Sequence, residues 1–313
     1  MNYKSLIKNQ SLRRRILRML SFIPDKPMIK LQYRLKMGRK LDLNNPKRFT
    51  EKIQWYKLYY KNPLMIQCVD KYDVREYVKS KGLGEILIPC YGVFDSADDI
   101  EWKSLPNQFV MKDTLGGGGN SVIIVKDKTK EDIAELKRRA KEWTKIYAHV
   151  KSDGREWPYY SGKKHRIIIE KYIEPEKSDE ETAATCVEHK EKHGLIDYKF
   201  FCFNGRSEFL YVMGDRQVGE KVSVGIYDKD YKKLPVLRLG DDDLGLIEKP
   251  KNFELMKSIA EQLAKEFLHV RVDLYSVGDN VLFGELTFYN ASGYMVYDPD
   301  DFDYTVGNYF KIH

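Results

Sequence analysis

The chain has 313 residues, of which 42% are hydrophobic and 32% are charged, so it is long enough for two lobes with cores of their own. No stretch reaches the eighteen apolar residues that a membrane span needs. The four cysteines contain no CxxC pair, which argues against a zinc site or a disulfide framework and fits a reducing cytoplasm.

Charge is unevenly distributed along the chain. Residues 1–50 hold fourteen Lys and Arg against two Asp, a net charge of about +12, which leaves about −5 for the remainder. A basic end on a mildly acidic body suggests an anionic partner, such as a membrane surface, a nucleic acid or an anionic polymer. A solvated helix face is the simpler alternative.

The N-terminal segment predicts a basic amphipathic helix over residues 6–22, which ends before Pro24. Its apolar residues are interrupted by arginines, unlike the continuous apolar stretch of a signal peptide. Such a helix suits an anionic membrane surface, and packing of its apolar face on the rest of the protein is an equal alternative.

Further helices are predicted over residues 30–40, over 44–62 with Thr50 as a candidate N-cap, and over 64–82. Short β-branched strands follow in residues 85–94, 109–113, 121–127 and 165–173, with a helix at 130–147 before the last of them. Residues 174–196 are polar and predict a mobile excursion.

The C-terminal part predicts a hairpin over residues 197–213 about Asn204-Gly205, then a helix over 252–267 and strands at 269–277 and 280–288. Strands and helices are mixed without strict alternation. The pattern therefore predicts α+β lobes and not a doubly wound sheet.

Four consecutive glycines stand between two of the predicted strands, at residues 116–119. No Lys-Ser/Thr pair follows them, and the next element is a strand and not a helix, so they form neither a P-loop nor a dinucleotide fingerprint. The segment predicts a strand–glycine loop–strand hairpin whose backbone N–H groups approach an anion. A mobile turn without a ligand is the alternative.

Seven motifs follow one another in an order that resembles an ATP-grasp domain: DKYDVREYVKSKG (70–82), ILIPCYGVF (86–94), FVMK (109–112), IIIEKYI (167–173), DYKFFCFNG (197–205), VRVDLY (270–275) and FGELTF (283–288). The detailed sequence, including residues 31–58 and GREWPYY (154–160), is similar to the TupA-like branch of that superfamily. This similarity extends from about residue 27 to the end.

The resemblance implies an α+β ATP-grasp fold in which two lobes clamp ATP. It implies an N-terminal basic helical region over residues 1–64, a lobe with the glycine-rich hairpin over 65–171, and a lobe with the metal site over 172–313.

The resemblance also implies ATP contacts. Lys71 and Lys112 resemble the two lysines that meet the α- and β-phosphates, and residues 170–173 resemble the hinge that reads the adenine edge through Lys171 and Ile173. An acidic residue, here Asp197, faces the ribose, and Lys199 shares its strand face. The implied cofactor-binding set is Lys71, Lys112, Gly116, Gly117, Gly118, Gly119, Glu170, Lys171, Tyr172, Ile173, Asp197 and Lys199. A surface cation and a plain interlobe strand are the alternatives for these lysines and this hinge.

Carboxylates on two strands predict a metal site. Arg271 and Asp273 stand two apart, as do Glu285 and Thr287, so each pair points from one strand face. Inward-facing carboxylates are costly unless they are paired or bind a metal, and Mg²⁺ bridging the phosphates of ATP explains them. The family pattern Glu-x-Asn is Glu-Leu-Thr here, so the third ligand is open between Thr287 and Asn290.

The resemblance implies catalytic roles for Lys112 and Arg271, and for Arg216 as a further phosphate or acyl-phosphate contact. The sequence departs from the family after Lys112, where DTLGGGG replaces an Asn-His-Gly type of sequence. GREWPYY has no counterpart in other ATP-grasp proteins. Its Arg155 and Glu156 are candidates for binding the acceptor carboxylate and the amine, and a structural ion pair beside Trp157 is the alternative.

Together these features predict a cytoplasmic ATP- and Mg²⁺-dependent carboxylate–amine ligase. It would join an amino acid or amine to a uronic acid of a cell-surface polysaccharide, as in teichuronopeptide synthesis, with peripheral contact to the inner membrane face through residues 1–22. An ATP-dependent kinase acting on a glycan is the alternative. A non-enzymatic module that binds membrane or nucleic acid would leave the ordered motifs without a task, so no nucleic-acid partner is expected.

Overall fold

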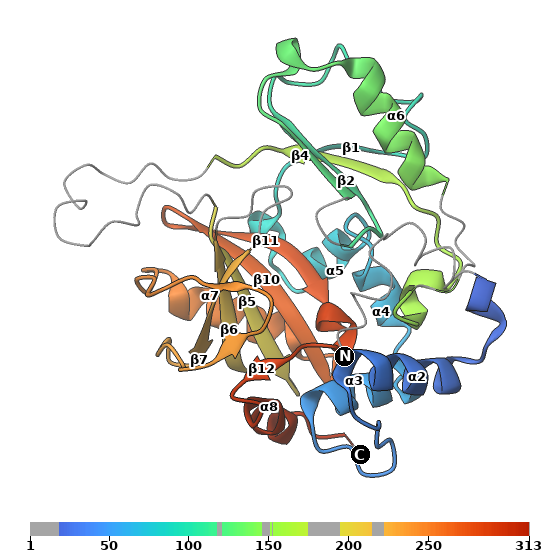
Figure 1. Ribbon diagram of the computed structural model, residues 1–313. Coiled ribbons are helices and arrows are strands. Elements are labelled where there is room, and N and C mark those ends of the chain that lie inside the picture. The colour runs from blue at the N-terminus through green and yellow to red at the C-terminus, as the bar shows by residue number, and fades with distance from the viewer. Residues whose placement is uncertain are drawn as a thin grey trace.

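The computed structural model describes residues 19–117, 121–145, 151, 153–174, 195–214 and 222–312. Two sheets dominate it, a small one with α6 (Ile133–Thr144) beside it and a large one with α7 (Phe253–Ala264) behind it (Figure 1). The small sheet is antiparallel, and the large one is antiparallel except at one edge, where residues 223–224 pair in parallel with residues 242–243. The α+β composition predicted from the mixed elements is confirmed.

The small sheet has the strand order β1-β4-β2-β3. Its strands are β1 (Cys90–Phe94), β2 (Phe109–Asp113), β3 (Val122–Val125) and β4 (Ile167–Lys171). Strands β2 and β3 pair from Phe109 opposite Val125 to Lys112 opposite Val122, so the predicted glycine hairpin is present. Gly116 and Gly117 belong to its described part, while Gly118 and Gly119 lie outside the described residues.

The large sheet has the strand order β11-β10-β5-β6-β7-β9. Its strands are β5 (Asp197–Phe203), β6 (Arg206–Gly214), β7 (Ser223–Asp228), β9 (Asp242–Asp243), β10 (His269–Val277) and β11 (Asn280–Thr287). The turn between β5 and β6 has φ of 49° at Asn204 and 77° at Gly205, the two positive values that a tight hairpin of this kind requires.

The two faces of the large sheet differ in chemistry. Helix α7 covers one face, where the Phe200 and Phe253 ring centroids are 5.8 Å apart and Val270 and Val272 are fully buried. Because side chains alternate along a strand, the neighbours Lys199, Arg271 and Asp273 point to the opposite face. The charged residues therefore sit on the side of the sheet that α7 leaves open.

Helices from both ends of the chain pack beside this sheet. They are α2 (Asp25–Met37), α3 (Phe49–Tyr59), α4 (Leu64–Cys68), α5 (Val74–Ser80) and α8 (Phe302–Tyr309), with short 3₁₀ turns at η2 (Leu20–Phe22), η3 (Gly84–Ile86), η5 (Lys128–Lys130), η6 (Trp157–Tyr160) and η8 (Asn290–Gly293). Figure 1 shows α2 and α3 adjacent to each other, with α8 below the large sheet.

Two local predictions for these helices were wrong. Arg48, not Thr50, is the N-cap of α3, because the Thr50 hydroxyl lies inside the helix and donates to Asp303 Oδ2 at 2.7 Å. The single helix expected over residues 64–82 is two helices. Asp70 Oδ1 accepts from the backbone N–H groups of Tyr72 and Asp73, both at 2.9 Å, and this turn separates α4 from α5.

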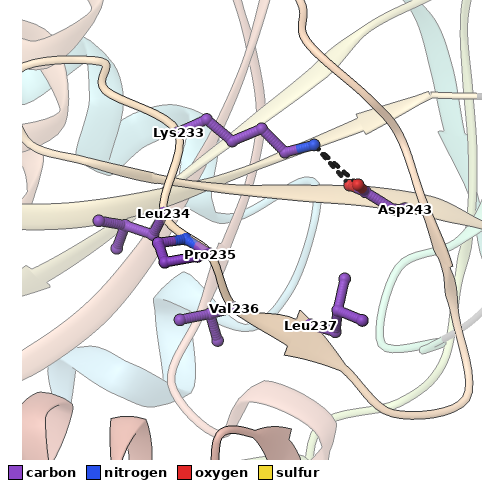
Figure 2. Close-up of a pocket in the computed structure, with 6 residues that line it drawn as sticks. All are labelled: Lys233, Leu234, Pro235, Val236, Leu237 and Asp243. Atoms are coloured by element: carbon purple, nitrogen blue, oxygen red, sulfur yellow. Dashed lines mark hydrogen bonds and ion pairs between the residues drawn. The ribbon is translucent and has the colours of Figure 1, made fainter.

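The segment between β6 and α7 contains strands β7, β8 (Leu237–Arg238) and β9, and β8 pairs with β12 (Tyr297–Asp298). A surface pocket of about 330 Å³ lies here, beside the Lys233–Asp243 ion pair of 2.7 Å (Figure 2). None of the predicted site residues lines it. Among the helices that the structure describes, none has the length and apolar character needed to cross a membrane.

The described residues form two main hydrophobic cores, one built from a continuous part of the sequence and one from two distant parts. The small core draws only on residues between 97 and 169, whereas the large one combines residues 49–87 with residues 198–310 and adds Leu115. A third, minor cluster joins α2 to residues 41 and 43. The boundaries expected at residues 64/65 and 171/172 stay a prediction.

Candidate active site

The charged residues of the open sheet face come from three adjacent strands. In the strand register Asp273 lies opposite Lys199 of β5 on one side and opposite Glu285 of β11 on the other. The two carboxylates expected to lie together are therefore neighbours. Asp197, Lys199 and Asp273 are almost fully buried, while the side chain of Glu285 is 40% exposed.

Arg271 is the centre of this group. Its Nε donates to Asp273 Oδ1 at 2.7 Å, and its Nη2 donates to Asp273 Oδ2 at 2.7 Å, to Thr287 Oγ1 at 3.0 Å and to Glu285 Oε1 at 3.3 Å. Its Nη1 donates to Asn290 Oδ1. All four residues predicted as metal ligands thus meet at one guanidinium, which is rigid enough to order several acceptors at once.

Lys199 joins the group from β5. Its ammonium contacts the carboxylates of both Asp197, at 2.5 Å, and Asp273. Burial raises the pKa of Asp273, and the Arg271 and Lys199 cations oppose that rise. Burial alone would lower the pKa of Arg271, but the carboxylates of Asp273, Glu285 and Asp197 together outweigh it, so this pKa rises and the guanidinium stays charged.

A β-bulge aims Glu285 at this group. Asp273 pairs with Glu285, but the next residue, Leu274, pairs with Phe283, so Gly284 is the extra residue of β11. A bulge bends its strand and redirects the adjoining side chain. A Cβ atom at residue 284 would lie 3.0 Å from the Asp273 carbonyl oxygen, so this close approach of the two strands favours glycine.

The group suits a hard cation. Its donors are carboxylate, amide and hydroxyl oxygens, and two cationic side chains face three carboxylates, so its formal net charge is about −1. Within the described residues no cluster of three or more His, Cys, Asp or Glu is placed to hold a metal. A cation here would therefore rest on Asp273 and Glu285 with the amide and hydroxyl oxygens of Asn290 and Thr287.

The residues predicted to bind ATP phosphates lie on the small sheet and at its junction with α4. Lys112 donates to Glu170 Oε2 at 2.7 Å, and Arg75 contacts Glu170 Oε1 at 3.3 Å. Lys71 donates to the carbonyl of Gly116 at 2.5 Å, at the base of the glycine loop. The structure brings Lys71 to the glycine loop, as its predicted role requires, and pairs Lys112 with a hinge residue.

The hinge and ribose positions give a mixed result. The Lys171 N–H donates to the Pro89 carbonyl at 2.9 Å, so this N–H is engaged within the sheet, and Tyr172 and Ile173 are partly exposed. Asp197 pairs with Lys199 inside the charged group and does not lie on an exposed strand edge. Its role against the ribose stays a prediction.

An ionic junction that the sequence did not reveal joins the segment before β4 to the turn between α4 and α5. Arg166, just before β4, donates to Asp70 Oδ1 at 3.0 Å and Asp73 Oδ1 at 2.8 Å, and Lys163 also contacts Asp73. The neighbouring His165 contacts Asp113 at 2.8 Å. The only sign of it in the sequence was the high density of charged residues in VDKYDVR, and such a density is also typical of a solvated helix.

Comparison with protein families decides the identity of the fold. A family model described as TupA-like ATPgrasp matches residues 51–311. The chain belongs to the TupA-like ATP-grasp family. The family and fold expected from the motif order are thereby confirmed. Enzymes of the ATP-grasp family bind ATP.

Solved structures give weaker likenesses. D-alanine–D-alanine ligase from Bacillus anthracis aligns with a TM-score of 0.43 and 18% identity, over 71% of this chain and 57% of that one. The corresponding ligase from Helicobacter pylori gives 0.41 and 13%, over 79% and 61%. The ATP-grasp ligase PsnB gives 0.40 and 9%, over 76% and 57%. The TupA-like protein thus spans less than two thirds of each of these chains. The comparison with curated proteins gave no match.

The GREWPYY segment of this TupA-like protein has two distinct parts. Arg155 is 3% exposed and donates to the carbonyls of Leu20 and Ile23 and to Asp25 Oδ1 at 3.0 Å. It therefore forms a structural ion pair, but with Asp25 and not with Glu156. Glu156 points elsewhere and accepts a hydrogen bond from Ser292 Oγ. Arg216 lies outside the described residues.

Proposed function

We propose that this TupA-like protein is an ATP-dependent carboxylate–amine ligase that forms an amide through an acyl phosphate. The observation that carries the proposal is the Arg271 fork, which gathers Asp273, Glu285, Thr287 and Asn290 around one buried cation. Such a fixed set of charges suits a reaction that needs positioning and neutralisation of phosphoryl charge.

The reaction consists of two displacements. A carboxylate oxygen of the first substrate attacks the γ-phosphorus of ATP and ADP leaves. The amine then attacks the acyl carbon, phosphate leaves, and the amine nitrogen loses a proton. Mg²⁺, when bound, would neutralise charge on the β- and γ-phosphates. Lys71 and Lys112 would contact phosphates, and Arg271 would stabilise the oxyanion of the tetrahedral intermediate.

We infer the substrates from the TupA-like family and the basic N-terminal region. The carboxylate would be a uronic acid in a cell-surface polysaccharide, as in capsule or teichuronopeptide synthesis, and the second substrate an amino acid or simple amine. An anionic polymer as acceptor agrees with the excess of Lys and Arg in residues 1–50.

ADP release over a matrix of glucuronate or galacturonate with the common amino acids tests this function, with mass spectrometry of the products. A ligase needs both partners and yields an amide with one ADP per bond. ADP release without an amine, together with a stable phosphorylated product, indicates the glycan kinase instead. If the protein binds anionic polymers in a salt-sensitive manner but does not bind ATP, both enzymatic functions are rejected and a non-enzymatic binding module is supported.

We further propose peripheral contact with an anionic membrane surface at the cytoplasmic face, to which the N-terminal arginines would contribute about 1 kcal/mol each. Co-sedimentation with anionic liposomes tests it against a chain that lacks residues 1–18. The cut belongs before residue 19, because Arg155 donates to the Leu20 carbonyl. Equal sedimentation of both chains would reject the membrane role of this segment.

A further inference from the structure

A backbone turn directly after β11 is held in an unfavourable conformation. Within η8, Ala291 and Ser292 have φ of 42° and 57°, in the left-handed region that non-glycine residues rarely adopt. Such conformations persist where their surroundings over-determine them, and they concentrate at binding and catalytic sites. Asn290, at the start of this turn, accepts from Arg271 Nη1. The strained turn therefore borders the candidate active site.

Two buried side chains of α3 hold this turn. Gln54 Nε2 donates to the carbonyls of Ser292 and Gly293 at 3.1 and 3.0 Å. Lys57 Nζ donates to the Ser292 carbonyl at 2.8 Å and to Ser292 Oγ at 3.3 Å. Both side chains are within 1% of complete burial, and the hydrogen bonds that their nitrogen atoms donate to Ser292 and Gly293 fix this backbone.

The same lysine attaches the GREWPYY segment to the turn. Lys57 Nζ also donates to the Gly154 carbonyl at 2.8 Å. Ser292 Oγ donates to Glu156 Oε1. A side chain at residue 154 would overlap Ser292 Oγ and crowd the Glu156 carboxylate, so glycine allows this close approach. Glu156 is thereby held at Ser292, which follows Asn290 by two residues in the chain, and Asn290 in turn accepts from Arg271 Nη1.

The Tyr159 hydroxyl is influenced by the charges of both Glu156 and Glu285. Burial raises the pKa of the Tyr159 hydroxyl, and the charges of Glu156 and then Glu285 raise it further, whereas Arg271 lowers it. One phenol thus lies within electrostatic reach of Glu156 on one side and of the β10–β11 group on the other. Tyr159 packs against the large core, which fixes this arrangement.

We propose that Glu156 binds the ammonium group of the amine substrate, with Ser292 and Lys57 as its positioning residues. This inference rests on the proposed ligase function and names its second substrate site. Glu156 is partly exposed, so a ligand can reach it, while the residues that orient it are buried.

The competing explanation is that Glu156 only balances the charge of Lys57. Lys57 hydrogen-bonds three neutral oxygens, of Gly154 and Ser292, and Ser292 Oγ in turn donates to Glu156. The charge of Glu156 also opposes the fall in the pKa of Lys57 that burial causes. A double variant Lys57→Met/Glu156→Gln separates the two explanations. If Glu156 served only as a counter-ion, removing both charges would restore normal behaviour.

The test measures thermal stabilisation by the twenty common amino acids and ethanolamine, each added to the full-length protein with Mg·ADP. At least one should raise the Tm of the wild type. Glu156→Gln should weaken the binding of that amine at least tenfold, and the double variant should not recover it. Glu142→Gln is the matched control, since the Glu142 side chain is 57% exposed on α6. Stabilisation by Mg·ATP alone should be equal in all variants, which shows that they are folded.

The outcomes separate this inference from the function on which it rests. The amine site is overturned if no amine stabilises the wild type, or if Glu156→Gln or the double variant binds the amine normally. If Glu156→Gln still releases ADP in an amine-dependent manner, with an unchanged KM for the amine, the proposed amine site is rejected and the ligase function is retained. Amine binding that depends on Glu156, in a protein without amide formation, would support the site and reject the ligase.

Discussion

Lys57→Met should remove a pH dependence of stability that a single buried amine creates. Lys57 is 1% exposed, and burial lowers its pKa from 10.5 to about 7, with Glu156 opposing the shift. Between pH 7 and 10.5 the unfolded chain holds this proton more tightly than the folded protein does. The free energy of unfolding therefore rises with pH in that window, and it is constant below it with respect to this group.

The size of the effect follows from the shift. A full shift of this kind is equivalent to about 5 kcal/mol, at 1.36 kcal/mol per pH unit, of which about 2 kcal/mol is gained between pH 7 and pH 9. Urea unfolding at pH 7, 8 and 9, followed by tryptophan fluorescence, measures it. The wild type should gain about 2 kcal/mol more than Lys57→Met over this range.

A matched control is Lys130→Met, because the Lys130 side chain is 82% exposed and should leave the pH profile of the wild type unchanged. Parallel profiles of the wild type and Lys57→Met would refute the reasoning. They would mean that Lys57 titrates like a solvated lysine, and that its three contacts with Gly154 and Ser292 do not hold in solution.

Four further changes have defined outcomes. Glu285→Gln should lower ADP formation about 100-fold or more at unchanged Tm, since the Glu285 side chain is 40% exposed; near-normal turnover would exclude a metal or phosphate role. Lys112→Ala should abolish the rise in Tm caused by Mg·ATP, and a full rise would place this lysine outside the nucleotide site. His269 is buried with its pKa lowered to about 3, so the wild type should lose about 2 kcal/mol between pH 7 and 5 that His269→Gln keeps; equal losses in urea titrations would contradict this. Gly307→Ala would push a methyl group into the Lys47 carbonyl and should cost about 1–3 kcal/mol, whereas Gly117→Ala, with open space around it, should be within about 0.5 kcal/mol; equal melting temperatures would refute the packing described here.

Much of the fold could be predicted from the sequence because its signals were local. Asn204-Gly205 fixed a hairpin, and the β-branched runs of β2, β3 and β4 marked their strands. The errors came where distant residues decided the outcome. Thr50 has the chemistry of an N-cap, but its hydroxyl donates a hydrogen bond to Asp303, a residue far along the chain. Strand β8 exists through its pairing with β12, which no local pattern reveals.

In the candidate site, too, the contacts set by local pattern could be predicted from the sequence, and those set by distant residues could not. Alternation along a strand was enough to place Arg271 beside Asp273 and Glu285 beside Thr287, and the resemblance supplied the pairing of the two strands. The contact of Lys57 with Gly154 and Ser292 could not be foreseen, because a lysine in a helix is ordinarily solvated and its partners are backbone carbonyls, which carry no sequence signal.

One main core comes from a continuous part of the sequence and the other from two distant parts, and this difference affects the order in which they can fold during synthesis on the ribosome. All residues of the small core have been synthesised by residue 169, so this lobe can fold while the rest of the chain is still being made. The large core unites residues 49–87 with strands that appear only from residue 198 onward. Its N-terminal helices, with apolar faces such as that of Phe49 and Ile53, must therefore wait uncovered until the C-terminal strands emerge. Chaperone dependence should accordingly fall on the early helices and not on the glycine hairpin that follows them.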